Sequence, residues 1–320
     1  MKQHKGRSKV SLLLFLLSSW AFMSVSGQHN HVYRDYLLHP HLINPAITGS
    51  QFFPVVGASY IKQWTGIPSS PGTQLASGSF RIGNFDFYNP KMYVNKTNLK
   101  AYEKIGAGFV LYNNTEGPVS SRGGQFSYAY HVPLTRARLS FGLSTGVYLN
   151  SIDESGLDPI NPNDPVLHYG KENYYRFNTG FGVYYYTPKY FGGVSITDFL
   201  PLQQQGLNNE RIGQDFHLVG GYMTEPANKI KFEPSVYLAF FDYKDFEFQI
   251  NSRIYFNHVN WINIHYQSIG EIGVNAGIKI NRIYFAYGFN ASISRIALYN
   301  LGTHEIHIGT NLGVRRLEGF

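Results

Sequence analysis

The chain has 320 residues, no cysteine and a net charge of +7, from 27 basic and 20 acidic residues. A chain without cysteine has no disulfide, no thiolate metal site and no cysteine for lipid attachment. Four of the basic residues lie within the first nine positions, so residues 28–320 keep 23 basic and 20 acidic residues, a net charge of only +3. The charge therefore gives no support to nucleic-acid binding.

Residues 1–27 have the pattern of a secretory signal peptide. A basic start precedes the mostly apolar stretch Val10–Met23, and Val25-Ser26-Gly27 supplies small residues for cleavage before Gln28. The apolar stretch is shorter than the roughly 20 residues of a spanning helix. We therefore expect an exported chain; an uncleaved N-terminal anchor is the alternative.

Residues 28–53 form an irregular N-terminal segment, because Pro40 and Pro45 break both helices and central strands. We expect this segment either to lie in the periplasm or to plug a barrel. Its histidines form two i, i+2 pairs, His29 with His31 and His39 with His41. Neither cysteine nor an acidic cluster accompanies them, so we expect solvated loop histidines rather than a metal site.

Residues 54–320 repeat one pattern, an alternation of apolar residues with small or polar ones. In Arg138–Asn150, Phe141 and Leu143 share one parity while Ser140 and Gly142 share the other. Successive side chains of a strand point to opposite faces, so each such segment has one apolar and one small or polar face. The expected strands are 55–64, 73–82, 104–113, 124–132, 138–150, 174–186, 190–196, 215–223, 230–240, 246–256, 261–267, 272–280, 283–290 and 306–314.

This pattern predicts an all-β fold, a transmembrane antiparallel β-barrel of about 14 strands in the outer membrane. No stretch after Gln28 reaches the roughly 18 apolar residues of a spanning helix. The chain is also rich in Gly (33), Tyr (25) and Phe (24). A count of about 12 or 16 strands, and a soluble two-layer β-protein, remain as alternatives.

The connections give a second criterion. With both termini in the periplasm, links from odd to even strands face outwards and should be long, as at 151–173, 197–214 and 291–305. Links from even to odd strands should be tight turns, as at Pro133–Ala137 and Asn281–Arg282. The link Gly83–Glu103 breaks this rule, and we interpret it as a functional periplasmic loop, a lumen plug or a mispredicted strand.

The sequence carries no recognisable site for chemistry. His304 and His307 flank Glu305, but three positions apart on a strand they point to opposite faces, whereas the zinc-protease pattern needs a helix. The outer-loop residues Asp158, Asn161, Asn163 and Asp164 lack the glycine and the glutamate of a calcium loop. We predict no catalytic, cofactor-binding or metal-ligating residue and no cofactor.

Small residues dominate the parity expected to face inwards, among them Ser140, Gly142, Gly180 and Gly182. A diffusion pore more typically has charged residues along its lumen, whereas small residues allow another piece of backbone to approach. We therefore expect an occupied lumen, filled by 28–50 or by 83–103.

Several stretches, in order, resemble the PorP/SprF family of type IX secretion system membrane proteins of Bacteroidota. They are Asn44-Pro45-Ala46 with Gly49, Gln63-Trp64-x-Gly66 with Pro71 and Thr73, Tyr128-Ala129-Tyr130, and Gly302-Thr303-His304-Glu305-Ile306. The positions that match family motifs are Asn44, Pro45, Gly49, Gln63, Trp64, Pro71, Thr73, Tyr128, Tyr130, Gly302, His304 and Glu305. Departures at Ile61, Thr303 and Asn290 leave the subgroup open.

The resemblance implies a non-enzymatic outer-membrane barrel of the type IX secretion or gliding machinery that helps to export or anchor a surface protein. It implies as partners the outer-membrane lipid, the periplasmic ring of that system and/or a secreted adhesin, and no nucleic acid. In the mechanism we expect, the long outer loops grip the exported partner, and 28–53 with 83–103 contact the machinery. Trp64, Tyr88 and Tyr112 are the candidate interface aromatics. The alternative is a transporter or channel for small hydrophobic or sugar solutes.

Overall fold

A computed structural model of the chain describes residues 36–50, 55–82, 101–153, 171–199, 213–224, 230–242, 245–256 and 260–311. The predicted signal peptide, His29, His31, Tyr88, most of the link 83–103 and the 158–164 loop lie outside these residues. Within them, no helix is long and apolar enough to cross a membrane.

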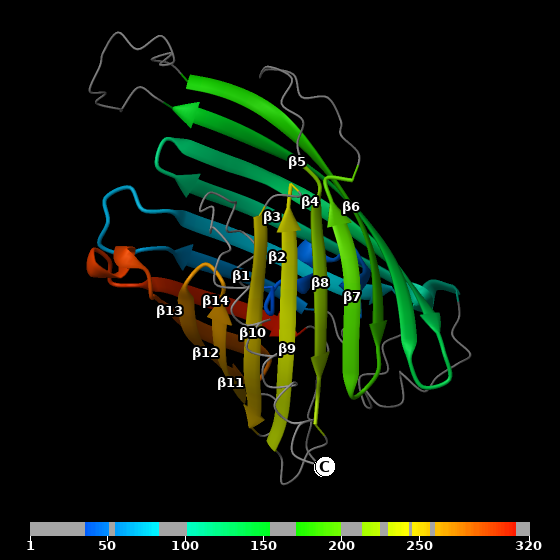
Figure 1. The fold of residues 1–320 in the computed structure, drawn as a ribbon. Coiled ribbons are helices and arrows are strands. Elements are labelled where there is room, and N and C mark those ends of the chain that lie inside the picture. The colour runs from blue at the N-terminus through cyan, green and yellow to red at the C-terminus, as the bar shows by residue number, and fades with distance from the viewer. Residues whose placement is uncertain are drawn as a thin grey trace, which may run out of the picture.

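Fourteen antiparallel strands form a closed barrel (Figure 1). They are β1 (Val55–Lys62), β2 (Gly72–Ile82), β3 (Ile105–Glu116), β4 (Val119–Pro133), β5 (Arg138–Asp153), β6 (Lys171–Tyr186), β7 (Tyr190–Thr197), β8 (Asp215–Tyr222), β9 (Ile230–Phe241), β10 (Asp245–Phe256), β11 (Asn260–Gln267), β12 (Glu271–Ile280), β13 (Ile283–Ser292) and β14 (Thr303–Asn311). Each strand pairs with its sequence neighbours, and β1 closes the ring by pairing with β14 from Val55↔Asn311 to Lys62↔His304.

The described helices are short. They are α2 (Pro40–Ile43), η3 (Pro45–Ile47), η4 (Ala101–Lys104) and η5 (Arg295–Leu298). The first two lie in the N-terminal segment, before the barrel begins, and η5 lies in the link between β13 and β14.

The predicted strands are confirmed, with differences at their ends. β4 begins at Val119 rather than at residue 124, because the run Ser120-Ser121-Arg122-Gly123 pairs with β5 although it interrupts the apolar alternation. The last strand, β14, begins at Thr303 rather than at residue 306, because Thr303 and Glu305 face the lumen, where polar residues are accommodated, and residues 312–314 lie outside the described part of the chain.

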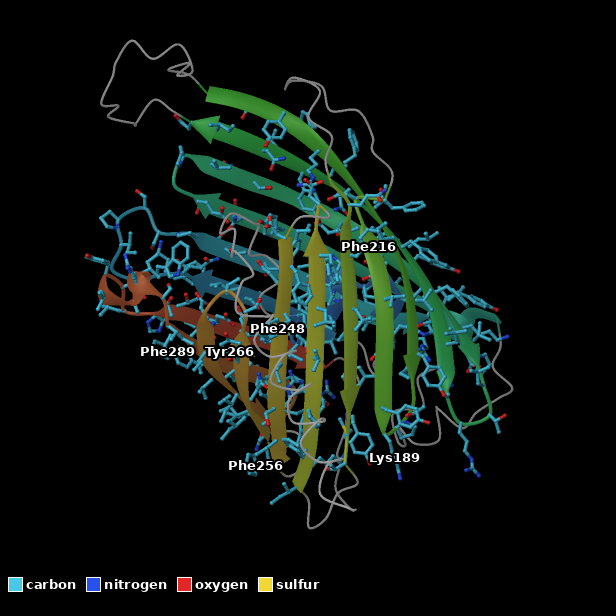
Figure 2. All side chains as sticks on the ribbon, in the orientation of Figure 1. Lys189, Phe216, Phe248, Phe256, Tyr266 and Phe289 are labelled. Atoms are coloured by element: carbon cyan, nitrogen blue, oxygen red, sulfur yellow. The ribbon has the colours of Figure 1, made fainter. Side chains whose placement is uncertain are left out.

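The faces alternate as predicted. Large apolar side chains point outwards and are exposed along every part of the ring, for example Leu111, Leu143 and Ile264. Figure 2 shows two more of these, Phe256 and Phe289, on the outside of the barrel. An apolar outside and a polar inside are what a barrel in lipid requires, and they rule out the soluble alternative with a dry core between two sheets.

The rule on link lengths holds only in part. The even-to-odd links at 134–137, 187–189 and 281–282 are tight turns, as predicted. Of the odd-to-even links, however, 117–118, 242–244 and 268–270 are also short. Gly117 (φ +58°) and Gly270 (φ +84°) are in the left-handed region that such turns need. The expectation that odd-to-even links are long is therefore wrong for these three.

Candidate functional site: the occupied lumen

Residues 36–50, called the plug below, lie inside the barrel, behind β8 to β10 in Figure 1. Two prolines shape this segment, since Pro40 opens α2 and Pro45 opens η3, positions where a missing N–H is tolerated. Between them, Asn44 caps η3 by accepting a hydrogen bond from the Ala46 N–H at 2.9 Å. The prolines that rule out a central strand thus begin two tight helical turns.

The barrel wall holds the backbone of the plug through side chains. Wall side chains bond to carbonyls of the plug, from Ser195 Oγ to Ile43 O (2.6 Å), Ser140 Oγ to Ala46 O (2.7 Å) and His131 Nε2 to Thr48 O (2.9 Å). In the other direction, Gly49 N–H of the plug donates to Ser79 Oγ of the wall (2.9 Å). With its other contacts, the plug is hydrogen-bonded to nine strands, β1 to β7, β9 and β10. The plug therefore spans the lumen and connects strands on opposite sides of the barrel.

Glycines on the inward face make room for this contact. A β-carbon at Gly142 would overlap the backbone of Pro45 and Ala46, and one at Gly106 would overlap that of Thr48. These contacts confirm the prediction that small inward residues allow another piece of backbone to approach.

Asn44 is the polar centre of the plug. Its side-chain amide donates to the carbonyls of Val183 and Val194, at 3.2 and 3.3 Å, while its Oδ1 caps η3. The residue is fully enclosed, and Gly182 leaves the space for it. A hydrophobic residue here would bury polar groups without a partner, which is unfavourable.

Two apolar clusters seat the plug on opposite sides of the lumen. Ile43, Ala46 and Ile47 pack with inward aromatics of β6 and β9, including Tyr184 and Tyr237. On the other side, Leu42 packs with Leu75 of β2 and Val110 of β3. Burial of these side chains drives docking, and the hydrogen bonds fix its register.

The plug histidines are buried, so the expectation that His39 and His41 are solvated is wrong. His39 bonds Ser77 Oγ through Nδ1 (2.8 Å) and Ser59 Oγ through Nε2 (2.6 Å), and Ser59 Oγ in turn meets His307 Nδ1 at 2.8 Å. The imidazoles thus serve as hydrogen-bonding links between the plug and the wall, which sequence spacing alone does not reveal.

Burial keeps both imidazoles neutral. It lowers the pKa of His41 to about 4, despite the opposing hydrogen bond to Phe109 O. Burial, with nearby His307 and His41, also holds the pKa of His39 well below its ordinary value. Protonation therefore opposes docking of the plug.

The wall from β9 to β12 carries longer polar side chains. The Tyr36 hydroxyl, at the start of the plug, meets Ser235 Oγ (3.1 Å) and accepts from Asn251 Nδ2 (2.9 Å). Further along this wall, the Arg253 guanidinium lies 4.8 Å from the Trp261 ring, donates to the Tyr255 hydroxyl and faces Glu233.

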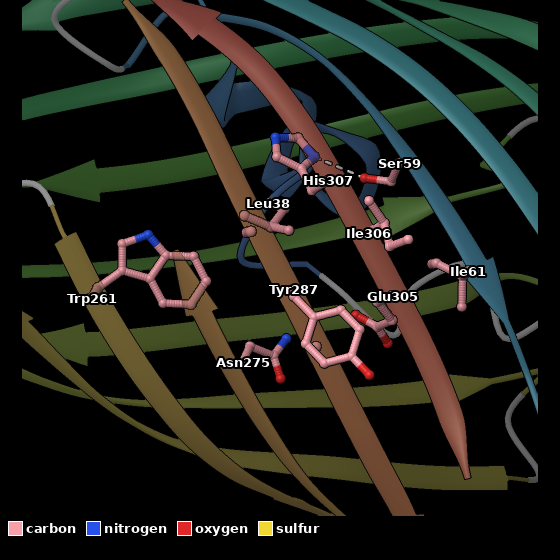
Figure 3. Close-up of a pocket in the computed structure, with 11 residues that line it drawn as sticks. Leu38, Ser59, Ile61, Trp261, Asn275, Tyr287, Glu305, Ile306 and His307 are labelled. Atoms are coloured by element: carbon pink, nitrogen blue, oxygen red, sulfur yellow. Dashed lines mark hydrogen bonds between the residues drawn. The ribbon is translucent and has the colours of Figure 1, made fainter. Parts of the chain in front are cut away.

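A small cavity remains where the plug does not reach, between Leu38 and β11 to β14 (Figure 3). Trp261, Asn275, Glu305 and His307 line it. It has room for about one water molecule, too little for a sugar or a nucleotide.

The predicted motif positions fall into three groups. Asn44, Pro45 and Gly49 lie in the plug, with Gly49 at φ +69° against Gly106. Tyr128 and Tyr130 point outwards from β4 and are exposed to the surroundings of the barrel.

The third group joins the links of the first and last hairpins at one rim. Thr65 N–H donates to Gly302 O (2.8 Å), and Leu301 N–H donates back to Thr65 O (2.7 Å). Beside this junction, Gln63 N–H donates to Pro71 O, Trp64 N–H reaches Thr303 Oγ1, and Thr73 Oγ1 donates to Asn114 Oδ1. Glu305 faces the lumen and accepts from Asn290, and His304 faces outwards to the Tyr287 hydroxyl.

This placement confirms that His304 and His307 point to opposite faces. It corrects the interpretation of Tyr112 as an interface aromatic, because Tyr112 faces the lumen, where its ring meets that of Tyr148 edge-on. In the described part of the chain, no group of three His, Cys, Asp or Glu residues could hold a metal ion.

Sequence reasoning missed the wall residues that bind the plug, namely Ser79, His131, Ser140 and Ser195. Their parity placed them on the inward face, but parity cannot tell which inward hydroxyl meets a plug and which meets another wall residue.

Comparison with known proteins agrees with this architecture. A sequence model of the family described as "Type IX secretion system membrane protein PorP/SprF" matches residues 25–310. No curated protein matches the chain.

Among solved structures, the outer membrane protein Omp33 of Acinetobacter baumannii superposes with a TM-score of 0.50 at 8% identity, covering 82% of this chain and 100% of that one. The Ralstonia pickettii toluene transporter TbuX gives 0.47 at 10% identity, with 84% and 90% covered. The CymD monoaromatic hydrocarbon channel gives 0.47 at 12%, with 87% and 94% covered. At such identities the likeness concerns the fold alone.

Proposed function

The chain belongs to the PorP/SprF family of type IX secretion system membrane proteins, and from this premise we propose that it helps to export or anchor a surface protein as a non-enzymatic outer-membrane barrel. The partners in this proposal are a secreted surface protein, such as an adhesin, on one side and components of the periplasmic ring on the other. Family membership implies secretion-machinery partners in general, and the structure suggests where they bind.

The observation that carries the proposal is an exposed apolar rim beside the junction of the first and last hairpins. In the link that contains η5, Leu298, Tyr299 and Leu301 are 82%, 75% and 72% exposed. Thr65 and Gly302 hold this link against the β1–β2 link through their backbones. An ordered surface with large apolar side chains is typical of a protein-binding site.

The rim lies at the end of the barrel opposite to that where β1 begins and β14 ends. With both termini in the periplasm, it faces outwards, where an exported protein emerges. The turns at the other end, such as 134–137 and 187–189, then face the periplasmic ring.

The occupied lumen supports a scaffold rather than a solute transporter. Residues 36–50 occupy space in the lumen that a transported sugar or hydrocarbon would need, and the cavity beside Leu38 has room for only about one water molecule.

The test replaces Leu298 and Leu301 by Asp in the full-length protein and measures surface display of the secreted partner and co-purification with it. We expect both to fall at unchanged barrel abundance, because burial of large apolar side chains is a main driving force of protein association and Asp removes it here. The matched control is Leu298→Met with Leu301→Met, which keeps apolar side chains of similar size at both positions and should leave display unchanged. Normal display by the rim variant, or an equal loss in the control, would reject this binding surface.

A second experiment concerns the link 154–170. Deletion of residues 163–169 should reduce display if this outer loop also grips the partner. Unchanged display after this deletion would restrict the gripping role to the rim around Leu301.

A further inference from the structure

The plug is attached to the wall in a way that permits its removal. It adds no strand to the sheet, and the fourteen strands close their ring without it. Its hydrogen bonds to the wall run through side chains or through single carbonyls, as with Ser195 to Ile43. The strand ladders that hold the barrel are therefore independent of the plug.

The wall beneath the plug is suited to water. Inward positions of β4 to β7 carry Ser127, Ser140, Ser144, Asn178 and Ser195, all buried while the plug is docked. The opposite wall adds an amide series that includes Asn251, Asn263 and Asn275. A hydrated lumen with such residues is stable, because water replaces every hydrogen bond that the plug makes.

Several of these groups are not satisfied by protein in the docked state. Within the described residues, Ser127 Oγ, Ser144 Oγ, Asn178 Oδ1, Asn263 Oδ1 and Asn275 Oδ1 are buried and bond to no other protein group. In a lumen that is permanently filled by protein, such groups are unfavourable, since apolar side chains of similar size would be buried there without losing hydrogen bonds. The same atoms are favourable along the wall of an aqueous channel.

From these observations we propose that the plug is removable, and that its departure turns the barrel into a channel for water and small hydrophilic solutes. This conditional conductance is an activity beyond the secretion role proposed above. The docked state is closed, and the polar wall belongs to the open state.

Two variants shift the plug in opposite directions. Gly142→Val places a side chain where the backbone of Pro45 and Ala46 lies, so plug and side chain cannot both occupy the site, while valine suits a strand. Asn44→Cys with Gly182→Cys locks the plug instead. A β-carbon at Gly182 lies 2.9 Å from Asn44 Cγ, which brings the two positions near the about 3.5–4.5 Å between β-carbons of a disulfide.

The experiment measures single-channel conductance of the purified full-length proteins in planar lipid bilayers. We expect the wild type to be closed and Gly142→Val to show steady conductance, with open time raised at least about tenfold. The cysteine pair should be silent when oxidised and should conduct after a reductant is added. The wild type has no cysteine, so the reductant alone changes nothing in it.

Gly192→Val is the matched control, because this glycine is on β7, two strands away, and its added β-carbon meets only Val219 O, at 3.7 Å. It should remain closed. The proposal is overturned if folded Gly142→Val is as silent as the wild type, or if the cysteine pair conducts equally in both redox states. Should Gly142→Val fail to fold, the cysteine pair decides alone, and silence after reduction also overturns the proposal. If the test at Leu298 and Leu301 refuted the proposed secretion role, the conductance results expected here would be the same.

Discussion

Asn44→Ala should release the plug without unfolding the barrel. The change removes the cap of η3 and the two hydrogen bonds to Val183 O and Val194 O. A lost N-cap weakens a helix by about 1 kcal/mol. Each lost hydrogen bond contributes about 0.5–1.5 kcal/mol. Together they weaken docking by about 2–4 kcal/mol, a factor of about 30 to 1000 in the equilibrium between docked and released plug.

The measurement is amide hydrogen exchange of residues 36–50, with a peptide from β5 as an internal reference for global opening. Exchange in the plug should accelerate by about the factor above, while β5 stays protected. Asn113→Ala is the control, because Asn113 is also a hydrogen-bonding asparagine but its one bond, to Gln74, lies on the exposed side of the molecule. Plug protection in Asn44→Ala equal to that of the control, or an equal loss in β5, would refute the reasoning that Asn44 fixes the plug.

Three further predictions follow from the geometry. Acidification should release the plug, because burial lowers the pKa of His39 and lowers that of His41 to about 4, whereas the released chain takes up protons below 6.5. The protection factors of the plug amides, corrected for the pH dependence of intrinsic exchange, should fall as the pH drops below 6.5, and the contribution of His41 should level off near 4. Gly302→Ala should lower the urea midpoint of unfolding by more than Gly270→Ala. Both glycines have a positive φ, +89° and +84°, but an added β-carbon at Gly302 meets an aromatic ring of β13, whereas the one at Gly270 meets open space. Equal effects of the two substitutions would assign the whole loss, about 1–3 kcal/mol, to backbone strain. Phe126→Arg, on the outward face of β4, should reduce unfolding free energy in lipid vesicles by about 2–4 kcal/mol, and an unaffected protein would place this residue outside the bilayer.

The barrel could be predicted from the sequence because each strand repeats the same two-residue signal. In β12, Ile272, Val274, Ala276 and Ile278 alternate with small or polar residues, and alternation of this kind fixes both the element and its outward face. The strand ends could not be predicted in the same way. Residues such as Ser120 and Thr303 pair within their strands, but they do not continue the alternation of apolar and polar residues that marks the strand.

For the interior of the barrel, the sequence predicts that the lumen is occupied, but not by which residues or through which contacts. Small inward residues such as Gly142 and Gly182 indicated that backbone would approach them. The identity of that backbone, and the burial of His39 and His41, depend on contacts between positions far apart in sequence, such as Ser195 with Ile43. No local pattern encodes such contacts, because the sequence of the plug resembles that of any irregular segment and the sequence of the wall resembles that of any barrel strand.

The pairing of β1 with β14 has a consequence for how partners can attach. A sheet with an open side can be extended by a foreign strand, since its unpaired N–H and C=O groups act as a template. Here Val55 to Lys62 are matched to residues 311 to 304 on one side and to β2 on the other, so neither the first nor the last strand offers such a template. An exported polypeptide therefore cannot dock by β-augmentation at this seam, and recognition there has to run through side chains.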